Sequence, residues 1–455
     1  MRVHFIAIGG AVMHNLAIAL HLKGYTVTGS DDEIFEPSRS RLKLYGLLPE
    51  EKGWHPEKII KEIDIVILGM HARADNPELL KASGMGIRIM SFPEFLYAQT
   101  KDKTRIVVAG SHGKTTTTAM IMHVMKASGV KFDYMVGSSI TGYETMVSLT
   151  DDSEFAILEG DEYLTSPIDR RPKFHLYKPD IAVLNGIAWD HMNVFPTFEN
   201  YVEQFRIFAD LIEPGGSLVY FADDQEVRKI AEKTREDVRK IPYRVHAHFQ
   251  NRTGFYAATI NRTVPVRIFG EHNMQNMSAA REACLAAGIT EDQFYEAINS
   301  FDGTSGRLQK LDENARGIFY YDFAHAPSKV KATVEAVSSR YPGRNIIACF
   351  ELHTFSSLNS NFLPFYRNTL EKATRAYVYF NPHQFEIKKL EPLSKDDVKQ
   401  AFGGDNVEVF DNSAGMLTAI RRANYDCPVY LFMSSGDFDG CDLRSLSKEL
   451  PGKAV

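Results

Sequence analysis

The sequence predicts an α/β protein of three consecutive domains, in which helices cover mostly parallel sheets. Short apolar runs alternate along the chain with segments of helical spacing, which is typical of parallel sheets. Glycine-rich turns follow two of these runs, at Gly9-Gly10 and between Gly110 and Thr117. At 455 residues the chain is also too long for a single hydrophobic core, which favours several domains.

The first domain is expected at residues 1–102 and to be Rossmann-like. A strand, a Gly-Gly turn, a helix and a second strand follow one another, with a further strand after a helix-like stretch. Two acids, Asp31 and Asp32, follow the glycine pair by about twenty residues, a spacing found in dinucleotide-binding folds. The expected strands lie at 3–8, 25–29 and 63–68, and the expected helix at 12–22.

A second domain is expected at 103–302, of the phosphate-loop ATPase type, and a third, Rossmann-like domain at 303–455. The polar, glycine-rich stretch 302–307 predicts the linker between them. In the second domain, strands are expected at 105–109, 155–158 and 181–184, with a helix at 118–127. In the third, strands are expected at 317–321, 345–350, 376–380 and 429–433.

Charge and composition limit the classes of partner. The formal net charge of −6 supplies no basic field for nucleic acid. No segment has the ~18–20 apolar residues that span a bilayer, and the N-terminus has the pattern of a strand rather than of a signal peptide. The four cysteines lack CxxC or metal-ligand spacing, which is typical of reduced thiols. We expect a cytoplasmic protein without nucleic-acid or membrane partners, as a monomer or weak dimer.

The second glycine-rich turn has the chemistry of a phosphate loop. Its glycines allow backbone N–H groups to approach phosphate oxygens, and the helix that follows adds positive potential. Lys114 is expected to reach the β- and γ-phosphates, and the Thr115 hydroxyl to ligate Mg²⁺. A solvated lysine in a glycine-rich turn is the alternative. The expected ATP-binding residues here are Gly110, Ser111, His112, Gly113, Lys114, Thr115 and Thr116.

The same loop resembles the G-T-H-G-K-T-T-T loop of the Mur ligases and their folate-polyglutamate relatives, with Ser111 replacing the first Thr. Further segments resemble motifs of that family in the same order across nearly the whole chain. Two departures are Gly306 and Ala326, which stand where the family has Arg and His. The segments are Glu159-Gly160-Asp161-Glu162, Asp190-His191, Gly270 to Asn276, Gly303 to Arg307 and Asp322 to Pro327.

The resemblance implies an ATP-dependent ligase that phosphorylates a carboxylate, after which an amine attacks the acyl phosphate. Lys114, Glu159 and His191 are the implied catalytic residues, and Thr115, Glu159 and His191 the implied Mg²⁺ contacts. On the residues alone, Glu159 at a strand end suits Mg²⁺, whereas His191 is an unusual ligand. Further ATP contacts are implied at Asn273, Asn276, Arg307, Asp322 and His325.

The remaining acids and the first domain complete the expected site. Asp161 and Glu162 are expected either at the surface or behind the ligand contacts, where they would support the residues that touch ligands. For Glu162, a direct contact with substrate or metal is an alternative. Asn273 also suits helix capping. In the first domain the resemblance implies UDP-sugar binding, whereas Gly9-Gly10 alone also fits a dinucleotide-dependent dehydrogenase. The expected UDP-sugar contacts are Gly9, Gly10, Ser30 and Asp31.

Two subgroups of the family, which differ in their amine substrate, are candidates for this sequence. Members that join L-alanine, or a whole murein tripeptide, to UDP-N-acetylmuramate lack the carbamylated lysine of other members, and no lysine lies between His191 and Arg206 here. The segment 169–177 and Ser30-Asp31 resemble the tripeptide subgroup, which acts in peptidoglycan recycling, and we favour that subgroup. L-Alanine addition in peptidoglycan synthesis, and a non-catalytic nucleotide-binding homologue, are the alternatives.

Overall fold

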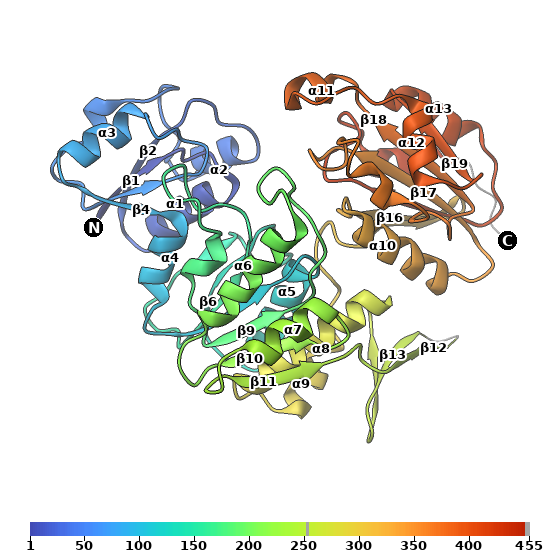
Figure 1. Cartoon of the computed structure of the whole chain (residues 1–455), viewed down its shortest axis with the longest axis horizontal. Coiled ribbons are helices and arrows are strands. Elements are labelled where there is room, and N and C mark those ends of the chain that lie inside the picture. Colours follow the sequence, from blue (N-terminus) through green and yellow to red (C-terminus); the bar gives the residue numbers. More distant parts are fainter. Residues whose placement is uncertain (252–253, 451–455) are drawn as a thin grey trace. The chain divides into compact units, whose positions relative to one another are not determined.

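Residues 1–251 and 254–450 are described by the computed structural model, drawn in Figure 1 from the blue N-terminus to the red C-terminus. The strands of these residues form four sheets, and helices alternate with most strands. The predicted α/β class is therefore confirmed. None of the described helices is both long and apolar enough for a membrane span. Residues 451–455 of the expected third domain lie outside this description.

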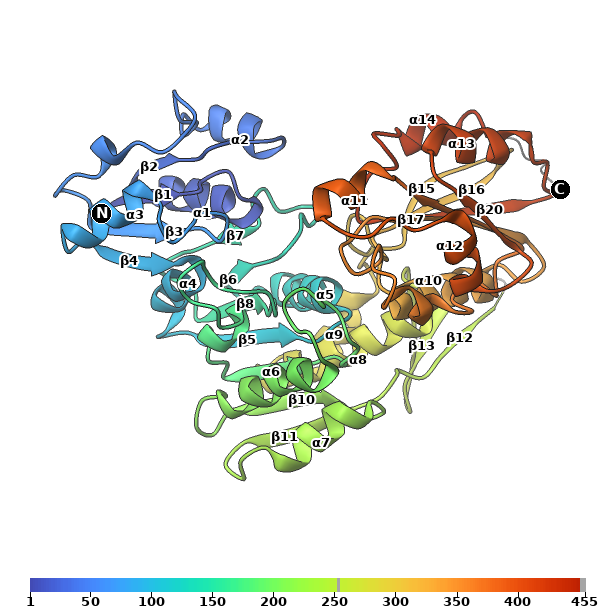
Figure 2. The same cartoon turned by 45° about the horizontal axis from the view of Figure 1, so that its top comes forward.

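The N-terminal sheet is parallel, with the strand order β2-β1-β3-β4 (Figure 2). Its strands are β1 (Arg2–Ile6), β2 (Thr26–Ser30), β3 (Ile65–Leu68) and β4 (Arg88–Ser91). The helices of this region are α1 (Ala11–Leu22), α2 (Ser38–Leu44), η1 (Pro56–Lys58), α3 (Pro77–Gly84) and α4 (Phe92–Thr100). The strand–turn–helix–strand unit expected at the N-terminus is present, with bounds shifted by one or two residues.

A seven-stranded sheet follows, in the order β11-β10-β9-β5-β8-β6-β7. Its strands are β5 (Thr104–Ala109), β6 (Phe132–Met135), β7 (Val147–Ser148), β8 (Phe155–Glu159), β9 (Ile181–Leu184), β10 (Ser217–Phe221) and β11 (Arg239–Tyr243). The helices of this region are α5 (Lys114–Ala127), η2 (Lys173–Leu176), α6 (Phe198–Asp210), α7 (Gln225–Lys233), α8 (Glu271–Ala286) and α9 (Glu291–Ile298). Only β7 pairs antiparallel, through β6.

Strand β5 lies at the middle of this sheet, between β8 and β9. Ile106, Val107 and Val108 are fully buried, as both faces of a parallel sheet require. The chain continues from β5 toward β6 and β8 on one side, and then crosses to β9 on the other. Ligands of open α/β sheets bind at the carboxyl ends of strands where such a reversal occurs. The loops after β5, β8 and β9 therefore meet at the position favoured for a site.

The remaining strands form two sheets. Three antiparallel strands, β12 (His248–Gln250), β13 (Phe255–Ala258) and β14 (Thr263–Val266), were not expected from the sequence. A six-stranded sheet has the order β15-β16-β20-β17-β18-β19. Its strands are β15 (Gln309–Asn314), β16 (Gly317–Asp322), β17 (Asn345–Leu352), β18 (Arg375–Phe380), β19 (Val407–Phe410) and β20 (Pro428–Met433). Its helices are α10 (Pro327–Arg340), η3 (Leu363–Tyr366), α11 (His383–Lys388), α12 (Lys395–Phe402), α13 (Ser413–Arg422) and α14 (Leu443–Ser447).

The chain divides into two compact units. The first contains residues 1–187, 199–244 and 278–298, with the N-terminal and seven-stranded sheets. The second contains 188–198, 245–277 and 299–455, with the other two sheets. Each sheet lies within one of these units. The domain boundaries expected after residues 102 and 302 stay predictions.

Within the first unit, a loop at 137–146, between β6 and β7, contacts the N-terminal domain. The Arg41 guanidinium of α2 donates to the Glu144 carbonyl oxygen at 2.7 Å. The Met146 N–H donates to Asn15 Oδ1 of α1 at 2.9 Å, in a buried position. Backbone and side-chain polar groups thus join this loop to two helices of the preceding domain.

Candidate active site

The phosphate loop leaves β5 at Gly110 and enters α5 at Lys114. Gly110 and Gly113 have φ values of 124° and 68°, which side chains with a Cβ rarely adopt. A Cβ on Gly110 would also lie 3.0 Å from Asn185 N. Both glycines therefore serve the loop's conformation, and α5 begins with its N-terminus at the loop, where N–H groups and positive potential favour an anion.

The start of α5 differs from the expected one. The sequence predicts a glycine-rich loop as far as Thr117 and a helix from Thr118. The structure places Thr115, Thr116 and Thr117 inside the helix, and all three are buried. Packing of this first turn outweighs the weak propensity of its residues.

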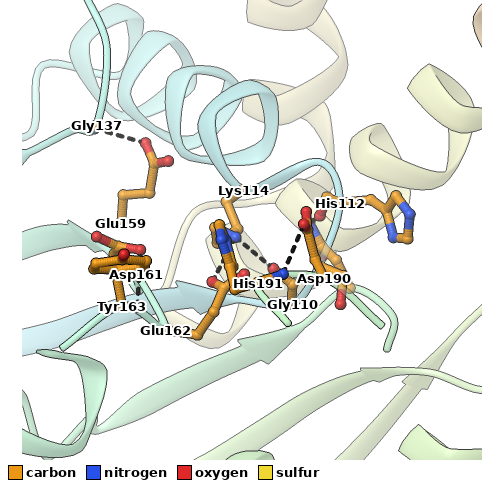
Figure 3. A network of polar contacts seen from close by, with 12 residues as sticks. Gly110, His112, Lys114, Gly137, Glu159, Asp161, Glu162, Tyr163, Asp190 and His191 are labelled. Atoms are coloured by element: carbon orange, nitrogen blue, oxygen red, sulfur yellow. Dashed lines mark hydrogen bonds and ion pairs between the residues drawn. The ribbon is translucent and has the colours of Figure 1, made fainter. Parts of the chain in front are cut away.

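Lys114 is held by groups of its own domain. Its Nζ donates to the Gly110 carbonyl at 2.8 Å and forms an ion pair with Glu162 Oε2 at 2.7 Å (Figure 3). Burial lowers the pKa of Lys114, but the Glu162 carboxylate outweighs this effect, so the net pKa lies above its ordinary value. The ammonium therefore stays protonated at neutral pH, as a phosphate contact requires.

Thr115 and Glu159 lie together, as the expectation of shared Mg²⁺ contacts requires. The Thr115 hydroxyl donates to Glu159 Oε1 at 2.9 Å, and the Gly137 N–H donates to Glu159 Oε2 at 2.8 Å. In Figure 3, the Glu159 side chain extends from its strand toward Gly137. A hydroxyl beside a carboxylate at a helix N-terminus fits the oxygen ligands that Mg²⁺ prefers, with waters and phosphate completing its shell.

Asp161 and Glu162 differ in their surroundings. Glu162 is 1% exposed, so of its two expected positions, at the surface or behind the ligand contacts, burial excludes the surface. Asp161 is partly exposed and pairs with Lys173 at 2.6 Å. The substrate or metal contact left open for Glu162 stays a prediction, and the structure pairs this residue with Lys114.

Buried polar residues brace the phosphate loop from behind. Asn185, which follows β9, donates to Thr117 Oγ1 at 2.9 Å and accepts from the Tyr243 hydroxyl at 2.9 Å. The Ser111 N–H donates to the Gly186 carbonyl at 2.8 Å. The loop is therefore fixed by the segment after β9, and its shape depends on residues far away in the sequence.

The N-terminal glycine turn is held by one of its expected partners. Asp31 is buried, and its Oδ2 accepts a hydrogen bond from the Gly9 N–H at 2.7 Å. Burial, with a smaller contribution from Asp32, raises the pKa of Asp31 to about 6. Ala7, where the family has glycine, adopts a φ of 67°. Ser30 is also buried, and the roles of these residues in UDP-sugar binding stay predictions.

The second unit contains the other expected site residues. Here Asp190 Oδ2 lies 3.4 Å from Lys329 Nζ and 3.9 Å from His325 Nε2. Burial and the nearby Lys329 cation lower the pKa of His325 to about 3, so the ring is neutral. His191 has a φ of 57°. Its assignment as a metal contact stays a prediction.

Five residues of the second unit, among them His325, were assigned to ATP from the resemblance. Asn273 and Asn276 are buried in the first turns of α8, and Asn273 Nδ2 donates to the Phe269 carbonyl at 2.9 Å. Arg307 lies over the Phe323 ring at 4.6 Å. Asp322 accepts from the Leu308 N–H at 2.6 Å, and burial raises its pKa.

The two departures from the family's motifs have local settings. Gly306 has a φ of 69°, which would strain an arginine at that position. Ala326 is buried and precedes the first turn of α10. Glycine at position 306 therefore suits the positive φ of the linker, where arginine would be strained. Nothing in the structure explains the loss of the histidine at 326.

The basic segment after the acidic element is partly neutralised. Arg171 donates to both carboxylate oxygens of Asp169, with Nη2 at 2.6 Å, and Lys173 is paired with Asp161. Arg170 is exposed. Attraction of an anionic peptide by this segment would therefore depend mainly on Arg170.

A phosphate loop at the carboxyl edge of a parallel sheet, with a protonated lysine and a hydroxyl–carboxylate pair beside it, defines the class of nucleotide-dependent α/β enzymes. Family models narrow the class. The model described as the Mur ligase middle domain matches residues 108–284, and that of the Mur ligase family catalytic domain matches 2–104.

Individual proteins agree with these models. The UDP-N-acetylmuramate--L-alanine ligase of Lactiplantibacillus plantarum is 30% identical over 454 residues, which cover 95% of each chain. The structure of the UDP-N-acetylmuramate-alanine ligase from Thermotoga maritima matches with a TM-score of 0.72 and 20% identity, over 98% of this chain and 99% of that one. A murein peptide ligase from Psychrobacter arcticus matches with a TM-score of 0.67 and 22% identity, over 98% of both chains.

This chain belongs to the Mur ligase family. It is an ATP-dependent ligase that forms an amide bond, as members of the family are. The three-domain α/β organisation expected from the sequence is confirmed by the likeness to the Thermotoga structure. The tripeptide subgroup favoured by the segment 169–177 is not confirmed, because the relatives carry the name of the L-alanine subgroup.

Proposed function

We propose that this ligase joins the lactyl carboxylate of UDP-N-acetylmuramate to the amino group of L-alanine, with conversion of ATP to ADP and phosphate. The observation that carries this proposal is 30% identity over nearly the whole chain to a ligase named for these two substrates. Its printed name supplies the acceptor and the amine. The geometry around Lys114 supplies a site suited to the phosphoryl transfer.

In the first step, a lactyl oxygen takes the γ-phosphoryl group of ATP, and ADP leaves. Negative charge spreads over the phosphoryl oxygens, so fixed cations stabilise the transition state. We assign this role to Lys114. We assign Thr115 and Glu159 to hold Mg²⁺, with His191 as a further contact; when bound, Mg²⁺ would neutralise phosphate charge.

In the second step, the amine nitrogen attacks the acyl carbon, loses a proton and expels phosphate. The amide bond then joins sugar nucleotide and amino acid. We keep the assignment of Asn273 and Asn276 to the adenine and nearby phosphates, of Arg307, Asp322 and His325 to ATP, and of the Gly9-Gly10 turn with Ser30 and Asp31 to the UDP group.

The murein tripeptide is a second candidate for the amine. The segment 169–177 favours it because this stretch resembles that subgroup more than the L-alanine enzymes. A 25% identical murein tripeptide ligase from Neisseria meningitidis also matches in structure, with a TM-score of 0.59 over 66% of this chain and 98% of that one. The two candidates share one acceptor and one reaction.

A turnover assay separates the candidates. Release of ADP is measured with UDP-N-acetylmuramate and either L-alanine or the tripeptide L-alanyl-γ-D-glutamyl-meso-diaminopimelate. The products are identified by mass spectrometry. We expect L-alanine to give the higher kcat/KM. A higher value with the tripeptide overturns the choice of amine, and absence of turnover with both supports a non-catalytic homologue.

A further inference from the structure

Two residues of the phosphate loop are tied to the same buried pair, Tyr201 of α6 and Glu162. Ser111 Oγ lies 2.9 Å from Tyr201 Oη, and Tyr201 Oη lies 3.0 Å from Glu162 Oε1. The other oxygen of Glu162 receives Lys114 at 2.7 Å. A continuous line of polar contacts therefore runs from the start of the loop to its lysine through residues that lie outside it.

The direction of the hydrogen bonds follows from the chemistry of the groups. An ionised carboxylate only accepts, so the Tyr201 hydroxyl donates its single proton to Glu162. The Ser111 hydroxyl must then donate to the Tyr201 oxygen. Lys114 donates to the remaining oxygen of Glu162. Each of these contacts thus has one donor and one acceptor, and each oxygen of the carboxylate accepts one hydrogen bond.

Burial makes this arrangement rigid. Tyr201 is 0% exposed, Glu162 1% and Ser111 2%. Away from water, a carboxylate that lost either donor would pay the cost of an unsatisfied buried charge. The long lysine side chain, which has several rotatable bonds, is thereby restricted in a place where it would otherwise be mobile.

We propose that Tyr201 and Glu162 are positioning residues for Lys114. Tyr201 fixes the orientation of the Glu162 carboxylate, and Glu162 holds the ammonium beside the phosphate loop. The nucleotide then meets a lysine that is already ordered, so less entropy is lost on binding. This inference rests on the proposed role of Lys114 as the phosphate contact.

The serine at position 111 agrees with such a role. Mur ligases have threonine there, and both residues carry a hydroxyl that donates a hydrogen bond. In this chain the hydroxyl donates to Tyr201 in a fully buried position.

The decisive variant is Tyr201→Phe, which removes one hydroxyl and keeps the ring. We expect KM for ATP to rise and kcat/KM for ATP to fall about tenfold, as for loss of a hydrogen bond to a charged group. KM for the sugar nucleotide should not change. A purely structural role would lower the active fraction, and with it kcat, without altering KM for ATP.

Tyr177→Phe is the matched control. Tyr177 is also fully buried in the first unit, and within the described residues its hydroxyl has no hydrogen-bond partner. Removal of this hydroxyl should leave KM for ATP unchanged. Equal effects of the two substitutions would overturn the proposal.

A second measurement uses Glu162→Gln, which keeps the length of the side chain and removes its charge. We expect KM for ATP to rise in this variant, because Lys114 loses the carboxylate that holds it. KM for the sugar nucleotide should not change. An unchanged KM for ATP in Glu162→Gln, with activity remaining, would contradict the assignment of Glu162.

Failure of this inference can be told apart from failure of the proposed function. Binding of ATP to the full-length protein is measured by calorimetry for the wild type, Lys114→Ala and Tyr201→Phe. If Lys114→Ala weakens binding and Tyr201→Phe matches its control, only the positioning role is lost. If Lys114→Ala binds ATP as the wild type does, the proposed role of Lys114 itself fails.

Discussion

The side chain of Lys114 is only 15% exposed and Glu162 is 1% exposed, so each charge depends on the other for its place in the fold. Such a pair contributes little net stability, but removal of one partner leaves a buried charge alone. Experiments on the phosphate loop therefore need variants that separate catalysis from folding.

For Lys114→Ala we expect kcat/KM to fall by more than about a hundredfold, because a preorganised charge contact to phosphate is lost. The unfolding free energy should also fall, by about 3 kcal/mol, since Glu162 stays buried without its partner. The double variant Lys114→Ala/Glu162→Gln should recover much of that stability and none of the activity. Near-normal turnover in either variant would refute the role of Lys114.

Asp31 gives a prediction about pH. Because burial raises its pKa to about 6 from 3.8, the folded state binds this proton more tightly than the unfolded state. Its contribution to stability is complete below the unfolded pKa and is lost as pH rises through about 6. Asp31→Asn keeps an acceptor for Gly9 and cannot titrate.

We therefore expect the unfolding free energy of Asp31→Asn, minus that of the wild type, to increase between pH 4 and pH 7. Urea titrations at several pH values measure this difference, in which the titration of groups that do not interact with Asp31 cancels. A difference that stays constant over this range would show that Asp31 titrates alike in both states.

Some residues of the site were predictable from the sequence and others were not. Gly110, Gly113 and Lys114 were assigned because their chemistry follows from a local pattern between a strand and a helix. Tyr201 and Glu162 could not be assigned as partners of the lysine, because only the packing of α6 and the segment after β8 brings them to the loop.

At the scale of elements, the buried strands were the most predictable. The strand at 181–184 has the expected bounds, because continuous apolar runs in the middle of a parallel sheet leave few alternatives. The sheet of β12, β13 and β14 was missed, since short edge strands with exposed polar residues carry little periodic signal. The start of α5 was misplaced because the loop was expected to extend to Thr117, whereas the helix begins at Lys114.

The charged side chains of the turn at 169–173 suggest a test of which amine the enzyme uses. Arg171 stabilises the turn through Asp169, so its reversal would disturb the local fold. Arg170→Glu is the cleaner change. With L-alanine as substrate we expect its KM to stay within about twofold, because a zwitterion gains little from a distant exposed charge.

With the tripeptide, the KM in Arg170→Glu should rise, and more so at low salt, because screening weakens exposed charge contacts. KM for ATP serves as the internal control. An unchanged tripeptide KM at low salt would mean that Arg170 is simply a solvated surface residue.

At the scale of the whole molecule, the C-terminal sheet carries its own core on both faces. Ile318 and Phe319, which are successive residues of β16, belong to separate buried clusters, as alternation along a strand requires. Of the buried residues in these clusters, Phe269 comes from outside the expected third domain, and the partly buried Met192 and Phe255 also pack against one of them. The core is thus nearly self-contained.

We expect a fragment of residues 303–455 to fold alone, with cooperative thermal unfolding followed by circular dichroism. Loss of the contact between Phe269 and Tyr320 should make it somewhat less stable than the same sheet in the full chain. A fragment that begins at 267 is the matched control. Absence of cooperative unfolding in both would place the boundary elsewhere.

The loop at 137–146 connects the Glu159 carboxylate to the N-terminal domain, through Gly137 at one end and through Glu144 and Met146 at the other. If this loop has to adopt one shape for both sites, their affinities are thermodynamically linked. Linkage is reciprocal: the factor by which UDP-N-acetylmuramate tightens Mg-ADP binding must equal the factor by which Mg-ADP tightens binding of the sugar nucleotide. Calorimetric titrations in both orders measure the two factors. In Arg41→Ala we expect both linkage factors to approach a value of one. Binding of a ligand to one domain would then no longer change the affinity of the other domain for its ligand.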